Sequence, residues 1–260
     1  MDKTLIWSDI HQRVDLLHAA LDTLKPKKII FLGDYWDNFN DSPREAIKMA
    51  MYLKQLMDEY PNWVYLLGNH DMAYVYPNND FELWCSGNTH EKRRAVRAIL
   101  SQHHFDKFKL CHFEQGYLFS HAGIHPQSVG NVLNYPQQQQ IPQLERLCKN
   151  VLENIKAGIS HPILGAGKSR GGSYPVGGIT WLDWSEFDPI EGINQIVGHT
   201  PRDNPRIAYN DVNEFYFTED QVSNPYLTSM NYCLDTHNKH YAFIEDGKVT
   251  IHETANAINT

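Results

Sequence analysis

The chain has 260 residues, of which 42% are apolar and 21% charged, and its formal net charge is −8. These values are ordinary for a soluble globular protein and allow a sizeable buried core. No apolar run approaches the roughly 20 residues that a membrane-spanning helix needs. The negative charge argues against an extended nucleic-acid surface, which normally carries a basic patch. We therefore expect no membrane as partner and no extended nucleic-acid surface.

The N-terminal segment and the cysteines bear on location. The apolar residues 4–7 lead straight into Asp9, without the basic region and small-residue cleavage site of a signal peptide. The four cysteines lie far apart and form no Cys-x-x-Cys pair. We expect the cysteines to be reduced and the protein to be cytoplasmic.

The first third of the chain alternates strand and helix patterns. Short apolar runs at 3–8, 28–32 and 63–67 predict strands, and apolar residues recur at helical spacing between them. This order is the βαβ pattern of a parallel sheet covered by helices. Because ligands gather at the carboxyl ends of such strands, polar residues at those ends suit a binding site. One follows each predicted strand: Asp9, Asp34 and Asn69.

The middle of the chain departs from this alternation. Residues 78–109 are polar with a helical pattern, and 117–120 predict a short strand that leads into His121. The glutamine run 137–140 precedes an apolar stripe at helical spacing. The glycine-rich stretch 165–178 predicts a loop.

The C-terminal part has a β pattern. Residues 232–234 predict a strand, and residues 240–245 and 248–253 predict a hairpin, because the Asp-Gly dipeptide between them favours a two-residue turn. We see no internal repeat and no interdomain linker. We therefore expect one domain over residues 1–260, with helical or loop insertions at about 78–109 and 125–178.

Five short stretches contain the side chains that bind borderline divalent metals, in glycine- or turn-rich junctions. They are Ser8-Asp9-Ile10-His11, Gly33-Asp34-Tyr35-Trp36-Asp37, Gly68-Asn69-His70-Asp71, His121-Ala122-Gly123 and Gly198-His199-Thr200-Pro201. Two metals about 3.5–4 Å apart, bridged by a carboxylate, are a recurring device for hydrolysing phosphate esters. The pattern predicts a dinuclear metal-dependent phosphoesterase.

Each stretch also has an ordinary structural explanation. Asp34 could cap a turn, and Asn69 after a glycine suits a turn. His121 and His199 could each be a core histidine bonded to the backbone. Only the order of the stretches along one chain makes the metal interpretation stronger than these alternatives.

The ordered series Asp-x-His, Gly-Asp-x-x-Asp, Gly-Asn-His-Asp, His-Ala-Gly and Gly-His-Thr resembles the calcineurin-like metallophosphoesterase superfamily, from Asp9 to about Asp235. The Ser-His-Ala-Gly and Gly-His-Thr-Pro segments resemble its phosphoprotein phosphatase branch, including the symmetrical diadenosine tetraphosphatases. This resemblance implies an α/β (α+β) catalytic domain. It implies a four-layer α/β/β/α sandwich of two mixed β-sheets, with helices on the outer faces and the metal site at the C-terminal ends of strands.

The resemblance also implies residue roles. It implies six metal ligands, of which Asp34 bridges: Asp9, His11, Asp34, Asn69, His121 and His199. A hydroxide held between the metals would attack phosphorus in line. His70 would protonate the leaving oxygen, and Asp37 would accept a hydrogen bond from His70 and raise its pKa. Mixed N and O ligands suit two ions of manganese, our first expectation, or of iron or zinc.

Three positions depart from the pattern of the protein-phosphatase branch. Its members carry arginine where this chain has Asn38, glycine where it has Gln12, and glycine or another small residue where it has His237. Arginine can grip phosphate through two parallel hydrogen bonds, and asparagine cannot supply that charge.

Another arginine can compensate for the loss at Asn38. Arg170, in a glycine-rich loop, precedes a Trp-Leu-Asp-Trp segment and resembles a second phosphate-binding arginine of the family. Arg13 is the other candidate, and a solvated loop arginine is the structural alternative. We expect Arg170 and Asn69 to contact the substrate phosphate.

Three functions remain open. The first is a phosphomonoesterase resembling a protein serine/threonine phosphatase, and the second is a nucleotide pyrophosphohydrolase of the diadenosine tetraphosphatase type. The third is a non-catalytic binding module on the same scaffold, which loss of ligands would reveal. The partner is thus a phosphorylated small molecule, nucleotide or phosphoprotein, because pocket walls rather than the fold choose the substrate.

Overall fold

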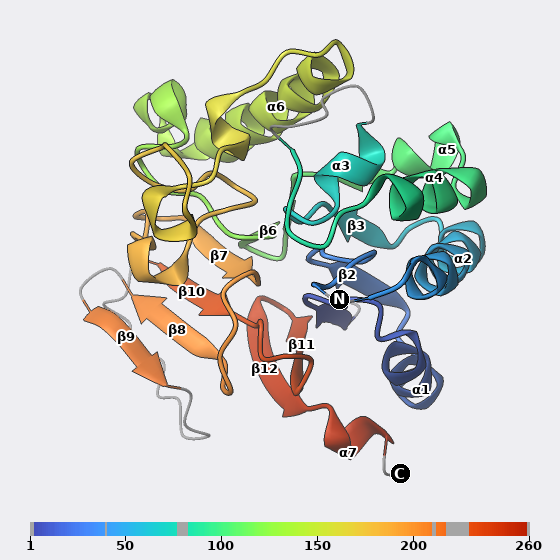
Figure 1. The fold of residues 1–260 in the computed structure, drawn as a ribbon. Coiled ribbons are helices and arrows are strands. Elements are labelled where there is room, and N and C mark those ends of the chain that lie inside the picture. Colours follow the sequence, from blue (N-terminus) through green and yellow to red (C-terminus); the bar gives the residue numbers. More distant parts are fainter. Residues whose placement is uncertain (1–2, 40, 77–82, 210–211, 217–228, 259–260) are drawn as a thin grey trace.

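The protein is described here by a computed structural model that covers residues 3–39, 41–76, 83–209, 212–216 and 229–258. Its strands form two six-stranded sheets, which lie against each other (Figure 1). No helix in this described part of the chain is long and apolar enough to cross a membrane.

The first sheet has the strand order β12-β11-β1-β2-β3-β4. Strands β1 to β4 run parallel, whereas β11 pairs antiparallel with both β1 and β12. The three strands predicted in the first third and the C-terminal hairpin are therefore confirmed. The strands are β1 (Thr4–Trp7), β2 (Lys28–Phe31), β3 (Val64–Leu66), β4 (Phe108–Lys109), β11 (His240–Glu245) and β12 (Lys248–Glu253).

The second sheet has the order β5-β6-β7-β10-β8-β9. Its central strands β6, β7 and β10 run parallel, and antiparallel strands flank them on both sides. The sequence pattern had indicated β6 and β10 but not the other four. The strands are β5 (Cys111–Glu114), β6 (Tyr117–Ser120), β7 (Asn194–Val197), β8 (Arg206–Tyr209), β9 (Val212–Tyr216) and β10 (Met230–Cys233).

Seven α-helices are described along these residues: α1 (Val14–Leu24), α2 (Pro43–Glu59), α3 (Met72–Val75), α4 (His90–Ile99), α5 (Gln102–Phe105), α6 (Gln137–Lys156) and α7 (Ala255–Ile258). Two details correct the sequence patterns. The glutamine run forms the first turn of α6 instead of preceding it. The end of the helical stretch 78–109 is strand β4, which pairs with β3.

Alternation along the strands explains the layers. Leu5 and Trp7 of β1 face a core shared with the helices, whereas Ile6 faces a core shared with the second sheet. Because side chains of a strand point alternately to opposite faces, a strand covered on both sides is apolar throughout. Helices α1, α2 and α4 cover the outer face of the first sheet, and α6 lies beside β4 and β5 (Figure 1). The fold is a mixed α/β sandwich of two mixed sheets with helices on its outer faces, as the resemblance implied.

Candidate metal centre

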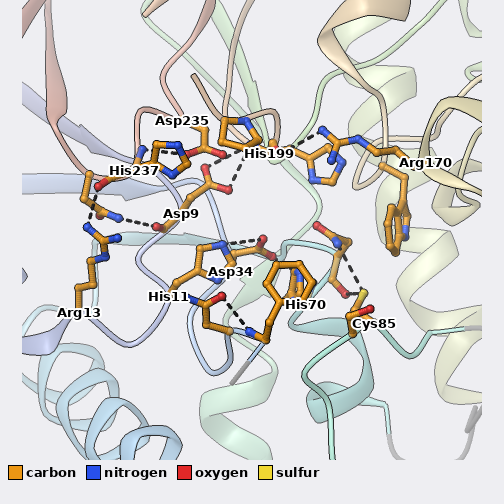
Figure 2. A pocket seen from close by; sticks show the side chains of 17 residues that line it. Asp9, His11, Arg13, Asp34, His70, Cys85, Arg170, His199, Asp235 and His237 are labelled. Carbon is orange, nitrogen blue, oxygen red and sulfur yellow. Dashed lines mark hydrogen bonds and ion pairs between the residues drawn. The ribbon is translucent and has the colours of Figure 1, made fainter. Parts of the chain in front are cut away.

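All six predicted ligands lie at carboxyl ends of strands and converge between the two sheets. They are Asp9 and His11 after β1, Asp34 after β2, Asn69 after β3, His121 after β6 and His199 after β7. Five of these side chains line one cavity of about 440 Å³ (Figure 2), and the sixth, His121, is fully buried and is not among its lining residues. The parallel strands therefore bring together residues from distant parts of the chain.

Four of these ligands have left-handed backbone conformations. The φ angles are +47° at Asp9, +41° at His11, +60° at Asp34 and +69° at His199. Such values are uncommon outside glycine, and strained backbone of this kind clusters at functional sites. The sharp turns point the ligand side chains back towards the end of the sheet.

The motif glycines allow the strand ends to approach closely. A Cβ atom at Gly68 would lie 2.0 Å from Oδ1 of Asp34, and one at Gly198 would lie 2.1 Å from Oδ2 of Asp9. Both distances are impossible contacts for a real side chain. Glycine at these positions is therefore required for the carboxylates to reach the centre.

Two groups of potential ligands share one carboxylate. Asp9, His11 and Asp34 form one group, and Asp34, His121 and His199 form the other. Oδ2 of Asp34 lies 3.5 Å from Nε2 of His11 and also 3.5 Å from Nε2 of His121. This oxygen is thus placed midway between the groups, as a bridging ligand must be.

Backbone carbonyls orient two of the imidazoles. Nδ1 of His121 lies 2.9 Å from the carbonyl oxygen of Leu32, and Nδ1 of His11 lies 2.7 Å from that of Asp37. A carbonyl only accepts, so each Nδ1 carries a proton, and a ring in its neutral form then has its lone pair on Nε2. Such outer hydrogen bonds are typical of metal-binding histidines.

The contacts of His121 test whether a cation fits. Its Nε2 lone pair faces Oδ1 of Asn69 at 2.9 Å and Oδ2 of Asp34 at 3.5 Å, which are both acceptors. Nδ1 of His199 lies 3.1 Å from Nε2 of His121, and a single proton on it can satisfy only one of these three acceptors. Nε2 of His199 is buried without a hydrogen-bond partner among the described residues. This donor set fits divalent cations.

Burial controls the charges of the cluster. Burial lowers the pKa of His121, and burial together with His121 and Arg170 lowers that of His199, so both rings stay neutral and able to bind metal. Burial also raises the pKa of Asp9, which faces the carboxylates of Asp235 and Asp34. Carboxylates gathered in this way need a compensating cation to remain ionised together.

His70 and Asp37 form a close pair at the wall of the cavity. Nδ1 of His70 lies 2.5 Å from Oδ1 of Asp37, which is completely buried. Burial of the imidazole opposes its charge, but Asp34 and Asp37 outweigh this effect and raise the pKa of His70 to about 9. This raised pKa favours the protonated imidazole near neutral pH.

Asp71 is a functional neighbour that the sequence analysis did not single out. Its buried carboxylate accepts hydrogen bonds from the backbone N–H groups of Asp34 at 2.7 Å, Tyr35 at 2.8 Å and Gly68 at 2.8 Å. It thereby ties the turn after β2 to the turn after β3. The sequence signal that could have identified Asp71 is its place as the last residue of the Gly-Asn-His-Asp motif.

Arg170 and Arg13 lie at opposite sides of the cavity (Figure 2). Nε of Arg170 is 2.6 Å from Oδ2 of Asp183, and its Nη2 donates to Oγ1 of Thr200 at 3.0 Å. Nη1 of Arg13 donates to the carbonyl oxygen of His237 at 2.7 Å. Both guanidinium groups are thus oriented by neighbouring loops.

Asn38 is committed to local structure. Its Oδ1 accepts a hydrogen bond from the backbone N–H of Phe39 at 2.8 Å, and its carbonyl oxygen lies 3.5 Å from Nζ of Lys92. Asn38 therefore does not replace the charge of the arginine that the family carries at this position.

The chain was compared with known proteins. The family model described as calcineurin-like phosphoesterase matches residues 3–203. No curated protein matches the sequence significantly.

Solved structures are similar in fold. A cold-active protein-tyrosine phosphatase of a psychrophilic Shewanella species has 14% identity and a TM-score of 0.56, with 96% of this chain and 80% of that chain covered. Another structure of a cold-active protein tyrosine phosphatase has 14% identity and a TM-score of 0.60, with 98% and 80% covered. A metallophosphoesterase from Sphaerobacter thermophilus has 18% identity and a TM-score of 0.47, with 96% and 87% covered. Because this family model matches most of the chain, the chain belongs to the calcineurin-like phosphoesterase family and is a phosphoester hydrolase.

Proposed function

We propose that the protein is a two-metal phosphomonoesterase. The observation that carries this proposal is the pair of ligand groups sharing Asp34, set beside the His70–Asp37 pair, of which His70 lines the same cavity as Asp34. The first supplies two adjacent cation sites, and the second supplies a proton donor. Hydrolysis of a phosphate ester needs both charge stabilisation at phosphorus and a proton for the leaving oxygen.

The ligand assignment follows the two groups. Asp9 and His11 hold the first ion, Asn69, His121 and His199 hold the second, and Asp34 bridges them. Bound divalent ions stabilise charge on phosphoryl oxygens and make water nucleophilic near neutral pH. We propose manganese as the metal, with iron or zinc as alternatives, because N and O donors suit each of them.

His70 acts as the general acid in this proposal. Its Nδ1 proton is shared with Asp37, which leaves the proton on Nε2 for the leaving oxygen. The raised pKa keeps this proton on the ring at neutral pH. General acids of this kind typically contribute about 10²–10⁴-fold to the rate.

The charge of the cavity favours a single phosphate. Arg13 and Arg170 are the only lysine or arginine side chains among its described lining residues. Arg170 is already close to Asp183, so it offers its remaining N–H groups to one phosphoryl group, together with the amide of Asn69. A polyphosphate carries several further charges and needs more cationic partners than this wall supplies.

The expected insertions supply parts of the wall. Cys85 and Ser86 belong to the stretch 78–109, and Arg170 belongs to the stretch 125–178. We propose that both stretches belong to one catalytic domain and that their side chains restrict which leaving group fits. More specifically, we propose phosphorylated serine or threonine side chains as the substrates, with nucleotides as the alternative.

A substrate panel tests the proposal. Protein saturated with manganese is offered an aryl phosphate, phosphopeptides, diadenosine tetraphosphate and a phosphodiester. We expect kcat/KM to be highest for a monoester, with about two equivalents of metal bound. Preference for diadenosine tetraphosphate, or fewer than about two equivalents at saturation, contradicts the proposal.

The substitution His70→Asn tests the acid. We expect kcat on phenyl phosphate to fall by about 100-fold while metal content stays at the wild-type level. His103→Asn, at an exposed position of α5, is the matched control and should leave kcat unchanged. Normal turnover by His70→Asn would remove His70 from the mechanism.

A further inference from the structure

The carboxylate of Asp37 has more partners than His70 alone. Its Oδ1 contacts Nδ1 of His70 at 2.5 Å, and its Oδ2 accepts a hydrogen bond from the hydroxyl of Tyr74 at 2.8 Å. Nδ2 of Asn88 also donates to Oδ2. Asp37 is completely buried, so these groups, and not water, define the rotation of its carboxylate.

Asn88 is itself held at both ends of its amide. Its Oδ1 accepts the backbone N–H of Cys85 at 3.1 Å, and its Nδ2 also lies 3.3 Å from the carbonyl oxygen of His70. An oxygen that accepts from an N–H must be Oδ1, so the network decides which end of the amide faces Asp37. Asn88 therefore presents a fixed donor to the carboxylate and contacts the backbone of the proposed acid.

A buried lysine holds the segment Cys85–Asn88, which we term the bracing loop, against the residue after Asp37. Nζ of Lys92 donates to the carbonyl oxygen of Gly87 at 2.9 Å and lies 3.5 Å from that of Asn38. A Cβ atom at Gly87 would lie 2.8 Å from the same carbonyl oxygen of Asn38. The bracing loop is thus packed against the segment that carries Asp37.

We propose that Asn88 and Tyr74 are positioning residues, which hold the carboxylate of Asp37 so that His70 points its Nε2 proton at the leaving oxygen. The inference rests on the proposed function. Hydrogen-bond donors to Oδ2 of Asp37 withdraw negative charge from its carboxylate. They therefore do not raise the pKa of His70, that is, they do not make His70 a weaker acid. They act by preventing rotation of Asp37, which would tilt the imidazole away from the leaving oxygen.

Two aryl phosphates separate this role from a general structural one. 4-Nitrophenyl phosphate and phenyl phosphate share a ring, but phenolate is the poorer leaving group and needs the proton more. We expect Asn88→Ala and Tyr74→Phe each to lower kcat on phenyl phosphate by about tenfold, and on 4-nitrophenyl phosphate by less than about twofold. Asn150→Ala, at an exposed position of α6, is the control and should change neither rate.

A spectroscopic measurement provides a readout besides activity. The Nδ1 proton of His70 lies in a short hydrogen bond to Asp37 and should therefore give a downfield proton NMR signal. The loss of this signal in the His70→Asn variant assigns it. We expect Asn88→Ala to shift or broaden this signal while thermal unfolding and metal content stay near wild type. If Asn88→Ala does not fold, Tyr74→Phe decides, because it removes one oxygen and keeps the buried ring.

The outcomes are distinct. Equal losses on both substrates, or unchanged rates with an unchanged NMR signal, overturn the positioning role while leaving the proposed function intact. A wild-type protein that hydrolyses neither substrate overturns the proposed function, and this inference falls with it.

Discussion

At the scale of single residues, two departures from the family pattern have a common explanation. Gln12 stands where the protein-phosphatase branch has glycine, and His237 where it has glycine or another small residue; their φ angles are +65° and +56°. These are the left-handed values that favour glycine. At both positions the backbone thus has a conformation that glycine adopts most easily, although the residue is not glycine.

His237 allows a test of this explanation. Its side chain is exposed, and its carbonyl oxygen rather than its ring binds Arg13. Left-handed backbone costs about 1–2 kcal/mol at a non-glycine residue, and the extra freedom of unfolded glycine offsets about 0.4–1 kcal/mol of the gain. We expect His237→Gly to raise the free energy of unfolding by about 0.5 kcal/mol in urea denaturation.

The matched variant for this test is His237→Val, whose branched side chain tolerates positive φ poorly. It should lower the free energy of unfolding by about 1 kcal/mol. If His237→Gly instead lost as much stability as His237→Val is expected to lose, the imidazole and not the backbone conformation would determine the free energy of unfolding at this position.

At the scale of elements, Glu114 links the two sheets. It lies on β5 and accepts hydrogen bonds from Oγ1 of Thr4 on β1 at 3.1 Å and from Nζ of Lys28 on β2. Nε2 of His112 lies 2.9 Å from Oε2 of Glu114, the oxygen that Lys28 also contacts. Burial works against its charge, but Lys28 and His112 outweigh burial and hold the pKa of Glu114 below its usual value.

This lowered pKa predicts a pH dependence of stability. The contribution of Glu114 is present above the ordinary glutamate pKa and is lost as pH falls through the lowered value. We expect Glu114→Gln to lower the free energy of unfolding at pH 7 by roughly 0.5–1 kcal/mol, because solvent screens part of the ion pair. The difference from wild type should shrink below about pH 4, as urea denaturation at several pH values will reveal.

The control for this prediction is Glu153→Gln on the exposed face of α6, where Lys156 is its partner. Its effect should be near zero at every pH, because surface ion pairs contribute little. A constant difference between wild type and Glu114→Gln from pH 7 to pH 3 would contradict the link between the sheets.

At the scale of the whole molecule, the proposed metal centre lies between the two sheets and takes its ligands from both. Asp9 and Asp34 come from the first sheet, His121 and His199 from the second, and buried carboxylates meet between them. A cation bound there stabilises only the folded chain. We therefore expect chelator treatment to lower the free energy of unfolding by about 2–3 kcal/mol at metal concentrations near 100 times Kd, and manganese to restore it.

Asp34→Asn separates this effect from general damage, since it removes the bridging charge. Its thermal midpoint should no longer respond to manganese, whereas Asp22→Asn on the exposed face of α1 should respond like wild type. An Asp34→Asn protein that still gains stability from manganese would place the metal elsewhere.

The sequence predicted the elements whose signals are local. The strands up to β3, helices α1 and α2, and the final hairpin follow from apolar periodicity and an Asp-Gly turn. Strands β5, β7 and β8 are as short as β1 and β2, but they mix polar with apolar residues and so carry no clear apolar pattern. Strand β7 pairs with β6 and β10, which lie far from it along the chain, so local sequence does not indicate its place in the sheet.

The ordered motifs by themselves determined the family, the candidate ligands and the His70–Asp37 pair, because those residue types and spacings serve one chemistry. Tertiary structure alone decided how the site is supported. Asn88 meets Asp37 across 51 positions of sequence, and Asp71 ties two strand ends through backbone N–H groups. Such contacts leave no local pattern, because they arise only when the packed sheets bring separate turns together.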